Sequence, residues 1–271
     1  MKREDAIDWS RLLLPYEQAV AELEVKFINI DKAYRKLGEY SPIETVSGRV
    51  KNIASIIDKA RRKDIPLTEV ESHMEDIAGV RIVTKFVEDI AKVVLMIRAR
   101  SGGDLEIVRE KDYINKSKES GYKSYHLIVK YAVYTPVGMR KIFSEIQVRT
   151  LAMNFWATIE HSLKYKYSNN MPQEVKERLI TCALASNNLD DEMAKIRGEI
   201  IEAQKILELK TTLVDEIVTK LKQISSYSDE IDVLNSQFYE LCDEGSLEKL
   251  YAFNKHIAVL SEMHRLHQKI V

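Results

Sequence analysis

The spacing of hydrophobic residues divides the chain into three stretches of different character. From residue 8 to residue 37, apolar side chains recur every three or four positions, which predicts one long amphipathic helix that ends before Pro42. A second helix is predicted over about 49–63, because Pro66 follows closely and stops it. From about residue 78 onward, the apolar residues no longer follow a helical spacing.

The middle stretch is predicted to be a sheet, because its apolar runs are short, β-branched and aromatic. A helix over 87–100 separates the first two of these runs, and from Thr150 onward the period is helical again. The expected fold class is α/β (α+β), with a mixed sheet of about five strands flanked by helices and followed by a helical C-terminal region. The clearest predicted strands are 78–86, 105–110, 125–134 and 141–148.

Composition fits a globular, helix-rich protein and restricts how it could bind anions. The 271 residues are 45% hydrophobic and 31% charged, with nine Gly and five Pro. The formal net charge is −1, so any attraction for phosphates must come from local clustering of basic residues.

Neither a membrane span nor a secretory signal is predicted. No apolar run approaches the roughly 18 residues that cross a bilayer, and charges interrupt the N-terminal MKREDAIDWSRLL throughout. We therefore expect the protein in the cytoplasm. The two cysteines, Cys182 and Cys242, lie far apart without metal-ligand spacing and are interpreted as reduced.

The segment SGRVKNIASIIDKARRK combines an apolar and a basic face if it is helical. At about 100° per residue, its polar residues Lys51, Ser55, Lys59 and Arg62 gather on one side, opposite Val50, Ile53, Ile57 and Ala60. A solvated lysine face is the usual explanation of such a pattern. Here, however, six basic residues are balanced by one acid, Asp58, which gives equal weight to binding of a polyphosphate or nucleic acid.

Two acids lie where neighbouring strands would bring them together. Strand alternation in KIFSEIQV places Glu145, Gln147 and Arg149 on one face, and Asp76 directly precedes the strand AGVRIV. Either acid alone suits a solvent face or a turn. Together with phosphate oxygens they could hold Mg²⁺, which needs few protein ligands, and this favours phosphoryl-type transfer.

The loop KESGYKSYH sets an aromatic ring between a glycine and a lysine. Alone, it is most simply a hairpin turn with surface lysines. The ring of Tyr122 could also stack on a nucleobase, with Lys116 and Lys118 near its phosphates and Gly121 permitting a close approach. No glycine-rich phosphate loop of a familiar nucleotide-binding fold occurs in the sequence.

These segments, taken in order, resemble the RelA/SpoT-type alarmone synthetases, and most closely the small synthetases of the RelQ kind. The resemblance covers residues 8 to about 205 and includes SPIETVSGRVKNIASIIDKARRK, EDIAGVRIV, KDYI, KESGYKSYH and EIQVRTLAMNFWATIEHSLKYKYS. It implies a nucleotidyltransferase-like sheet. The implied activity transfers the β,γ-pyrophosphate of ATP to the 3′-hydroxyl of GTP or GDP, which gives pppGpp or ppGpp and AMP in the stringent response.

The resemblance also implies roles on the ATP side, position by position. Arg49 and Arg81 would sandwich the adenine, and Asp76 would bind Mg²⁺. Glu145 would assist the metal and act as the base on the 3′-hydroxyl. The ATP phosphates would be held by Lys51, Ser55, Lys59 and Arg62.

On the acceptor side, the resemblance makes Tyr122 the platform on which guanine stacks. Lys118 and His126 would contact the phosphates of the GTP or GDP. Gln147 and Asn154 would line the site. A homotetramer is implied as well, and no His-Asp motif of the hydrolase domain occurs, so we expect synthesis without degradation.

Several points stay open at this level. Lys111 fits the charge pattern of bifunctional relatives, which leaves GDP and GTP as alternative acceptors. Thr45 and Ile28 stand where the tetramers activated by pppGpp would carry an aromatic and a basic residue, so allosteric activation is undecided. We place the synthetase domain at 1–205 and a helical extension of unknown role at 206–271.

Two rival functions remain compatible with the sequence. Basic loops with tyrosines also suit single-stranded RNA, which would make the chain an RNA-binding regulator. A toxin-type relative would pyrophosphorylate another acceptor, such as tRNA or an adenosine nucleotide. The guanine-type loop around Tyr122 argues against the second alternative.

Overall fold

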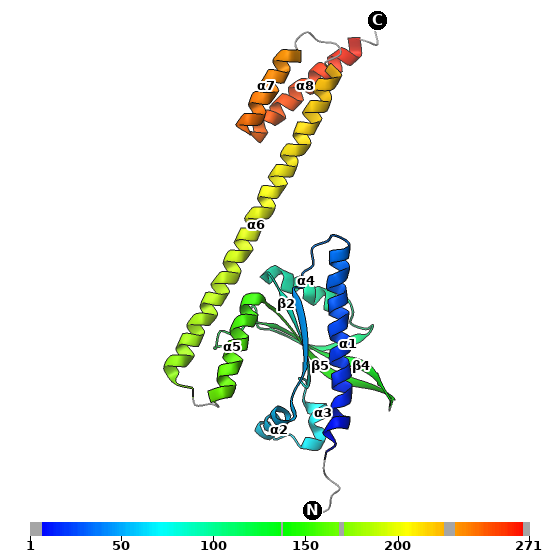
Figure 1. The fold of residues 1–271 in the computed structure, drawn as a ribbon, viewed down its shortest axis with the longest axis vertical. Coiled ribbons are helices and arrows are strands. Elements are labelled where there is room, and N and C mark those ends of the chain that lie inside the picture. Colours follow the sequence, from blue (N-terminus) through cyan, green and yellow to red (C-terminus); the bar gives the residue numbers. More distant parts are fainter. Residues whose placement is uncertain (1–6, 137, 168–170, 225–230, 268–271) are drawn as a thin grey trace, which may run out of the picture. The chain divides into compact units, whose positions relative to one another are not determined.

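The computed structural model describes residues 7–136, 138–167, 171–224 and 231–267. Contacts divide the chain into two compact units, Met1–Ala194 and Lys195–Val271, and each is described by itself. Residues 1–6, with which the predicted synthetase domain begins, lie outside the described residues. Figure 1 shows the elements along the chain.

The first unit is built on a five-stranded mixed sheet in the order β1-β2-β5-β4-β3 (Figure 1). Only β2 and β5 run parallel, and the other neighbouring pairs are antiparallel. This confirms the predicted fold class. The strands are β1 (Thr45–Val50), β2 (Ala78–Thr84), β3 (Leu105–Asp112), β4 (Tyr125–Thr135) and β5 (Gly138–Thr150).

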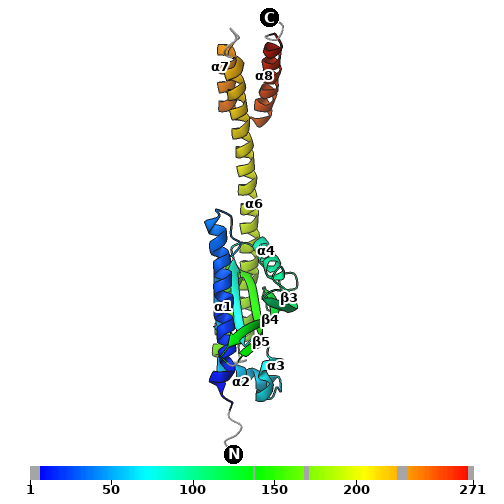
Figure 2. The ribbon, with the colours of Figure 1, turned by 90° about the vertical axis from the view of Figure 1, so that its right-hand side faces the viewer.

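One face of the sheet carries the main hydrophobic core under α1 (Trp9–Lys36) and α4 (Val87–Arg98). Figures 1 and 2 show α1 lying along the strands. The Asp8 side chain caps α1 by accepting a hydrogen bond from Arg11 N at 3.1 Å. A Cβ at Gly48 would lie 2.3 Å from Val20 Cγ1, so only glycine lets β1 approach α1 this closely.

The helix predicted over 49–63 is shorter than expected. Residues Thr45–Val50 form the edge strand β1, and α2 spans Ile53–Arg62 with the Asn52 side chain as its cap. Lys51 therefore precedes the helix, and its predicted place on the basic helical face was wrong. The buried face of α2 is formed by Ile56 and Ala60, while Ile53 is exposed, which also corrects the predicted apolar face.

The opposite face of the sheet is covered by α5 (Leu151–Tyr167), and the first part of α6 (Gln173–Ile224) lies on the outer side of α5 (Figure 1). Trp156 Nε1 donates to the carbonyl of Leu179 at 2.9 Å, and Thr150 Oγ1 donates to Asp190 at 2.7 Å. These bonds fix the two helices against the end of β5. Between β1 and β2 lie the short helices η2 (Leu67–Glu69) and α3 (Val70–His73).

The second unit has its own hydrophobic core. The last part of α6 packs with α7 (Ile231–Glu244) and α8 (Leu247–His267) around Ile217, Leu250 and Ile257, none of which is exposed. This agrees with the helical C-terminal region that the sequence predicts. Among the described residues, no helix is long and apolar enough to cross a membrane.

Candidate active site

Two lysines converge on Asp76 at the start of β2. Lys51 Nζ lies 2.8 Å from Asp76 Oδ2, and Lys59 Nζ lies 2.6 Å from Oδ1. Burial acts to raise the pKa of Asp76, but the two lysines outweigh it and hold the pKa below its usual range. The structure thus brings together three residues predicted for the ATP side, although Lys51 arrives from the end of β1.

Arg49 and Arg81 lie on the adjacent strands β1 and β2. They line a small cavity of about 70 Å³ together with Asp76, Glu145 and Gln147. Burial, and then the charge of Arg49, lower the pKa of Arg81. Two guanidinium groups that repel each other across a cavity make a site prepared for an anionic or π-rich ligand.

Glu145 lies on β5 beside Gly79 of β2, on the face that strand alternation predicts. Its Oε1 is 2.8 Å from His126 Nδ1, and its Oε2 accepts from Gln147 Nε2 at 2.8 Å. Burial acts to raise the pKa of Glu145, and these hydrogen bonds lower it further than burial raises it. A carboxylate in this setting is ionised at neutral pH.

The Tyr122 ring lies against α5, next to Trp156, with ring centroids 6.4 Å apart. Its hydroxyl is 2.8 Å from His126 Nε2 and accepts from Arg149 Nη2 at 3.3 Å. Lys118 Nζ lies 4.9 Å from the centre of the ring. The ring, the lysine and His126 are therefore brought together as predicted for the acceptor side, although their nucleotide contacts stay predictions.

The predicted site residues Ser55, Arg62 and Asn154 do not line the small cavity around Asp76 and Glu145. Ser55 lies in the first turn of α2, where Asn52 caps its backbone N–H, and Arg62 pairs with Asp58 at 3.1 Å on the exposed end of that helix. Asn154 is on α5, and its Oδ1 is buried with no hydrogen-bond partner among the described residues. Its place in the acceptor site therefore stays a prediction.

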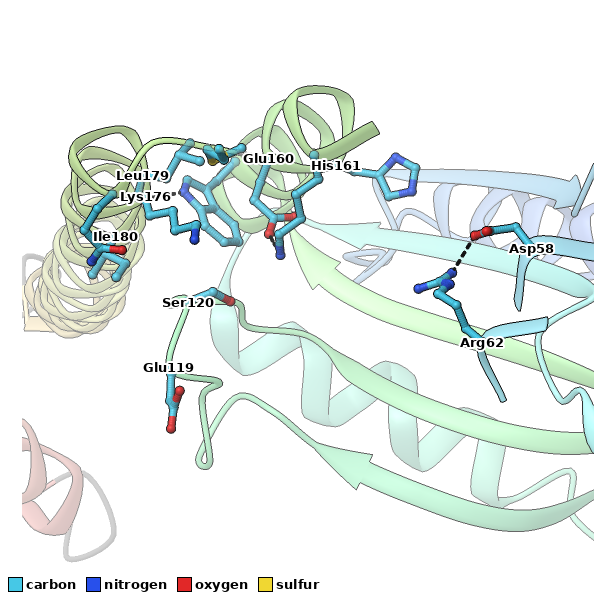
Figure 3. A pocket seen from close by; sticks show the side chains of 13 residues that line it. Asp58, Arg62, Glu119, Ser120, Glu160, His161, Lys176, Leu179 and Ile180 are labelled. Carbon is cyan, nitrogen blue, oxygen red and sulfur yellow. Dashed lines mark hydrogen bonds and ion pairs between the residues drawn. The ribbon is translucent and has the colours of Figure 1, made fainter. Parts of the chain in front are cut away.

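A larger cavity of about 1010 Å³ opens between α2, α5 and the loop before Tyr122. Figure 3 shows Glu160 and His161 on α5, between Ser120 of that loop and the Asp58–Arg62 pair. Burial, then the charge of Arg49, lower the pKa of His161. Sequence reasoning missed both α5 residues, because their spacing from Trp156, four and five positions, is a signal only once the helix is known to roof the sheet.

Two carboxylates at the small cavity fit a magnesium ion. Asp76, just before β2, and Glu145, on the neighbouring strand β5, line the same small cavity. Among the described residues no group of three or more His, Cys, Asp or Glu side chains could hold a metal by itself. Two carboxylates that leave the other positions to water and phosphate oxygens match the way Mg²⁺ binds at nucleotide sites.

Known proteins share the sequence around this site. The model "Region found in RelA / SpoT proteins" matches residues 48–170, which contain nearly all the residues above. Over 200 residues the chain is 55% identical to the GTP pyrophosphokinase YjbM of Bacillus subtilis, which covers 74% of this chain and 93% of that protein. The chain belongs to the RelA/SpoT family.

Solved structures agree with this membership of the RelA/SpoT family. The small alarmone synthetase 1 of Bacillus subtilis bound to its product pppGpp has a TM-score of 0.68 and 55% identity. That match covers 71% of this chain and 97% of the other. A GTP pyrophosphokinase family protein of Streptococcus pneumoniae has a TM-score of 0.69 and 49% identity, covering 73% and 97%.

Proposed function

We propose that this RelA/SpoT-family chain is an enzyme, a GTP pyrophosphokinase that converts ATP and GTP or GDP into AMP and pppGpp or ppGpp. The observation that carries the proposal is the meeting of Asp76 and Glu145 in one cavity with Arg49 and Arg81. The relatives named GTP pyrophosphokinase, at 55% and 39% identity, support it.

On the donor side, cationic side chains receive the triphosphate. Lys51 and Lys59 already face a carboxylate, so they are held in place for negative charge. The adenine lies between Arg49 and Arg81, whose flat guanidinium groups stack well on aromatic rings. Ser55 and Arg62 extend the phosphate contacts along α2.

On the acceptor side, guanine stacks on Tyr122, and Asn154 supplies an unpaired amide oxygen to a donor group of the base. Lys118 and His126 lie next to the nucleotide, and Gln147 lines the site between the two substrates. Lys118 covers the ring in this structure, so a stacked base takes its place over Tyr122.

Glu145 is the proposed catalytic base. It takes the proton from the 3′-hydroxyl while that oxygen forms a bond to the β-phosphorus of ATP. The bond from the β-phosphorus to the bridging oxygen of the α-phosphate breaks, and AMP leaves with the electron pair. The low pKa of Glu145 keeps the group ionised before the reaction.

Mg²⁺ is the proposed cofactor, held by Asp76 with help from Glu145. When bound, it neutralises phosphate charge that develops during transfer. Lys51 and Lys59, which lie beside Asp76, would add positive charge there and orient the ATP phosphates.

The finer assignments are proposals that rest on the resemblance. We infer synthesis without hydrolysis, a homotetramer and a cytoplasmic location. The synthetase domain spans 1–205 and the extension 206–271, with the boundary inside α6. Binding of single-stranded RNA is retained as a regulatory role, and a tRNA or adenosine acceptor is not favoured by the names of the relatives.

The experiment is a comparison of acceptors under one set of conditions. Purified protein receives ATP and Mg²⁺ with GTP, GDP, a second portion of ATP or tRNA, and the nucleotides are separated by anion exchange. We expect AMP together with a guanosine 3′-diphosphate product from GTP or GDP. A product only with tRNA or ATP, or none with any acceptor, would refute the proposal.

A further inference from the structure

Five side chains of the site form a closed circuit of hydrogen bonds. Starting at Arg149, one arm runs through the Tyr122 hydroxyl and His126 to Glu145 Oε1. The other arm runs from the same guanidinium nitrogen through the Gln147 amide to Glu145 Oε2. The circuit connects the guanine platform with the proposed base.

The direction of every bond in this circuit follows from its two ends. An arginine only donates and an ionised carboxylate only accepts. Glu145 Oε1 therefore accepts a hydrogen bond from Nδ1–H of His126, and in the neutral imidazole Nε2 then accepts from the Tyr122 hydroxyl. The hydroxyl oxygen in turn accepts from Arg149, so the whole arm has one consistent polarity.

The second arm has the same polarity. Gln147 accepts from Arg149 through Oε1 and donates to Glu145 through Nε2. Its neighbour across the sheet is His126, in direct register on β4, so the two arms lie side by side. Each carboxylate oxygen of Glu145 receives one hydrogen bond and keeps a lone pair for the substrate hydroxyl.

The circuit is also partly shielded from water, with Arg149 and His126 buried and the other three side chains half-buried. Arg149 is 3% exposed and His126 is 7% exposed, and burial strengthens each bond while making a broken one costly. The Tyr122 ring closes the circuit on the side of α5. Neither histidine nitrogen is left over for a phosphate in this arrangement.

We propose that Arg149, His126 and the hydroxyl of Tyr122 are positioning residues that orient Glu145 for the 3′-hydroxyl. Tyr122 then has two separable roles, because its ring faces the acceptor base and its hydroxyl fixes His126. The inference rests on the proposed function, in which Glu145 is the base.

The test separates the ring of Tyr122 from its hydroxyl. Tyr122→Phe keeps the stacking surface and removes both hydrogen bonds of the hydroxyl, to His126 and from Arg149. If the lost orientation of Glu145 is worth about 1 kcal/mol, kcat is expected to fall about fivefold, while KM for GTP changes by less than about twofold. Tyr134→Phe is the matched control, since it removes an exposed hydroxyl from the far end of β4 and should leave both constants unchanged.

Two further variants test separately the hydrogen bonds made by Nδ1 and by Nε2 of His126. His126→Asn retains an amide donor near the place of Nδ1, whereas His126→Gln places its amide near Nε2. We expect kcat to be rescued better by Asn than by Gln, with thermal unfolding showing that both variants are folded.

The outcomes are distinct. If the wild-type protein makes no product, the proposed function fails. If it is active and Tyr122→Phe retains the wild-type kcat, the positioning role is wrong. A rise in KM for GTP without a change in kcat, in both histidine variants, would instead assign His126 to the acceptor phosphates and overturn the inference.

Discussion

At the scale of single residues, the account depends on a half-buried carboxylate, Glu145, that two neighbours hold in one orientation. Glu145→Gln keeps the shape of the side chain and removes its ability to take a proton. We expect kcat to fall by about 100-fold or more, with dissociation constants for ATP and GTP within a few-fold of the wild type. Stopped assays and calorimetric titration measure the two effects. A variant with nearly full rate would show that Glu145 is not the base.

A second residue-scale prediction concerns acid stability far from the site. A hydrogen bond from Arg100, with Lys26 next, lowers the pKa of Asp104 from 3.8 to about 2. A carboxylate with a lowered pKa stabilises the fold above its unfolded pKa and loses that contribution as the pH falls through the folded value. Wild type should therefore exceed Asp104→Asn in urea midpoint at pH 6, and the difference should shrink towards pH 2. An equal difference at both pH values would contradict this assignment.

At the scale of elements, the loop before β4 is fixed by its contact with α6. Gly121 has a φ of +81°, and a Cβ there would lie 2.4 Å from the Cβ of Ala183. Gly121→Ala should displace the loop and raise KM for the guanosine acceptor much more than KM for ATP. Adding Ala183→Gly should restore part of the loss, because it removes the clash but not the backbone strain.

Gly102 offers the matched control for this prediction. It has a φ of +89°, and a Cβ there would meet nothing within 4 Å. Gly102→Ala should cost stability through backbone strain and leave both KM values unchanged. Equal changes in KM for both glycine variants would mean that strain alone, and not the contact with α6, determines the loop.

The sequence predicted elements well where a single period decides them. The spacing of apolar residues located α1, α4 and strands β2 to β5, and strand alternation placed Glu145, Gln147 and Arg149 on one face. It missed β1, because TVSGRV contains a glycine, a serine and an arginine and becomes a strand only through pairing with β2. The circuit around Glu145 could not be predicted, since its bonds join residues 122–126 to residues 145–149, and only the register of the folded sheet brings these two segments together.

At the scale of the whole molecule, a substitution in one of the two hydrophobic cores should destabilise the unit that contains it more than the other unit. Leu250 lies at the centre of the second core with 0% exposure, and Leu250→Ala should cost about 2–5 kcal/mol there while leaving kcat unchanged. Both tryptophans, Trp9 and Trp156, belong to the first unit. Fluorescence therefore follows that unit, and circular dichroism follows both.

Leu23→Ala, in the first core, is the matched variant. It should lower the urea midpoint seen by fluorescence, whereas Leu250→Ala should change only the circular dichroism transition. If Leu250→Ala shifts the fluorescence midpoint equally, the two units unfold as one. That result would argue against a separate extension at 206–271.

The fate of a labelled phosphate tests the central claim most directly. The protein is incubated with ATP labelled at the γ-phosphorus, GTP and Mg²⁺, and the products are separated. Transfer of pyrophosphate predicts one AMP for each labelled guanosine product, with no ADP above the control that contains Glu145→Gln. ADP formed in step with the labelled product would mean transfer of a single phosphate, and would contradict the account.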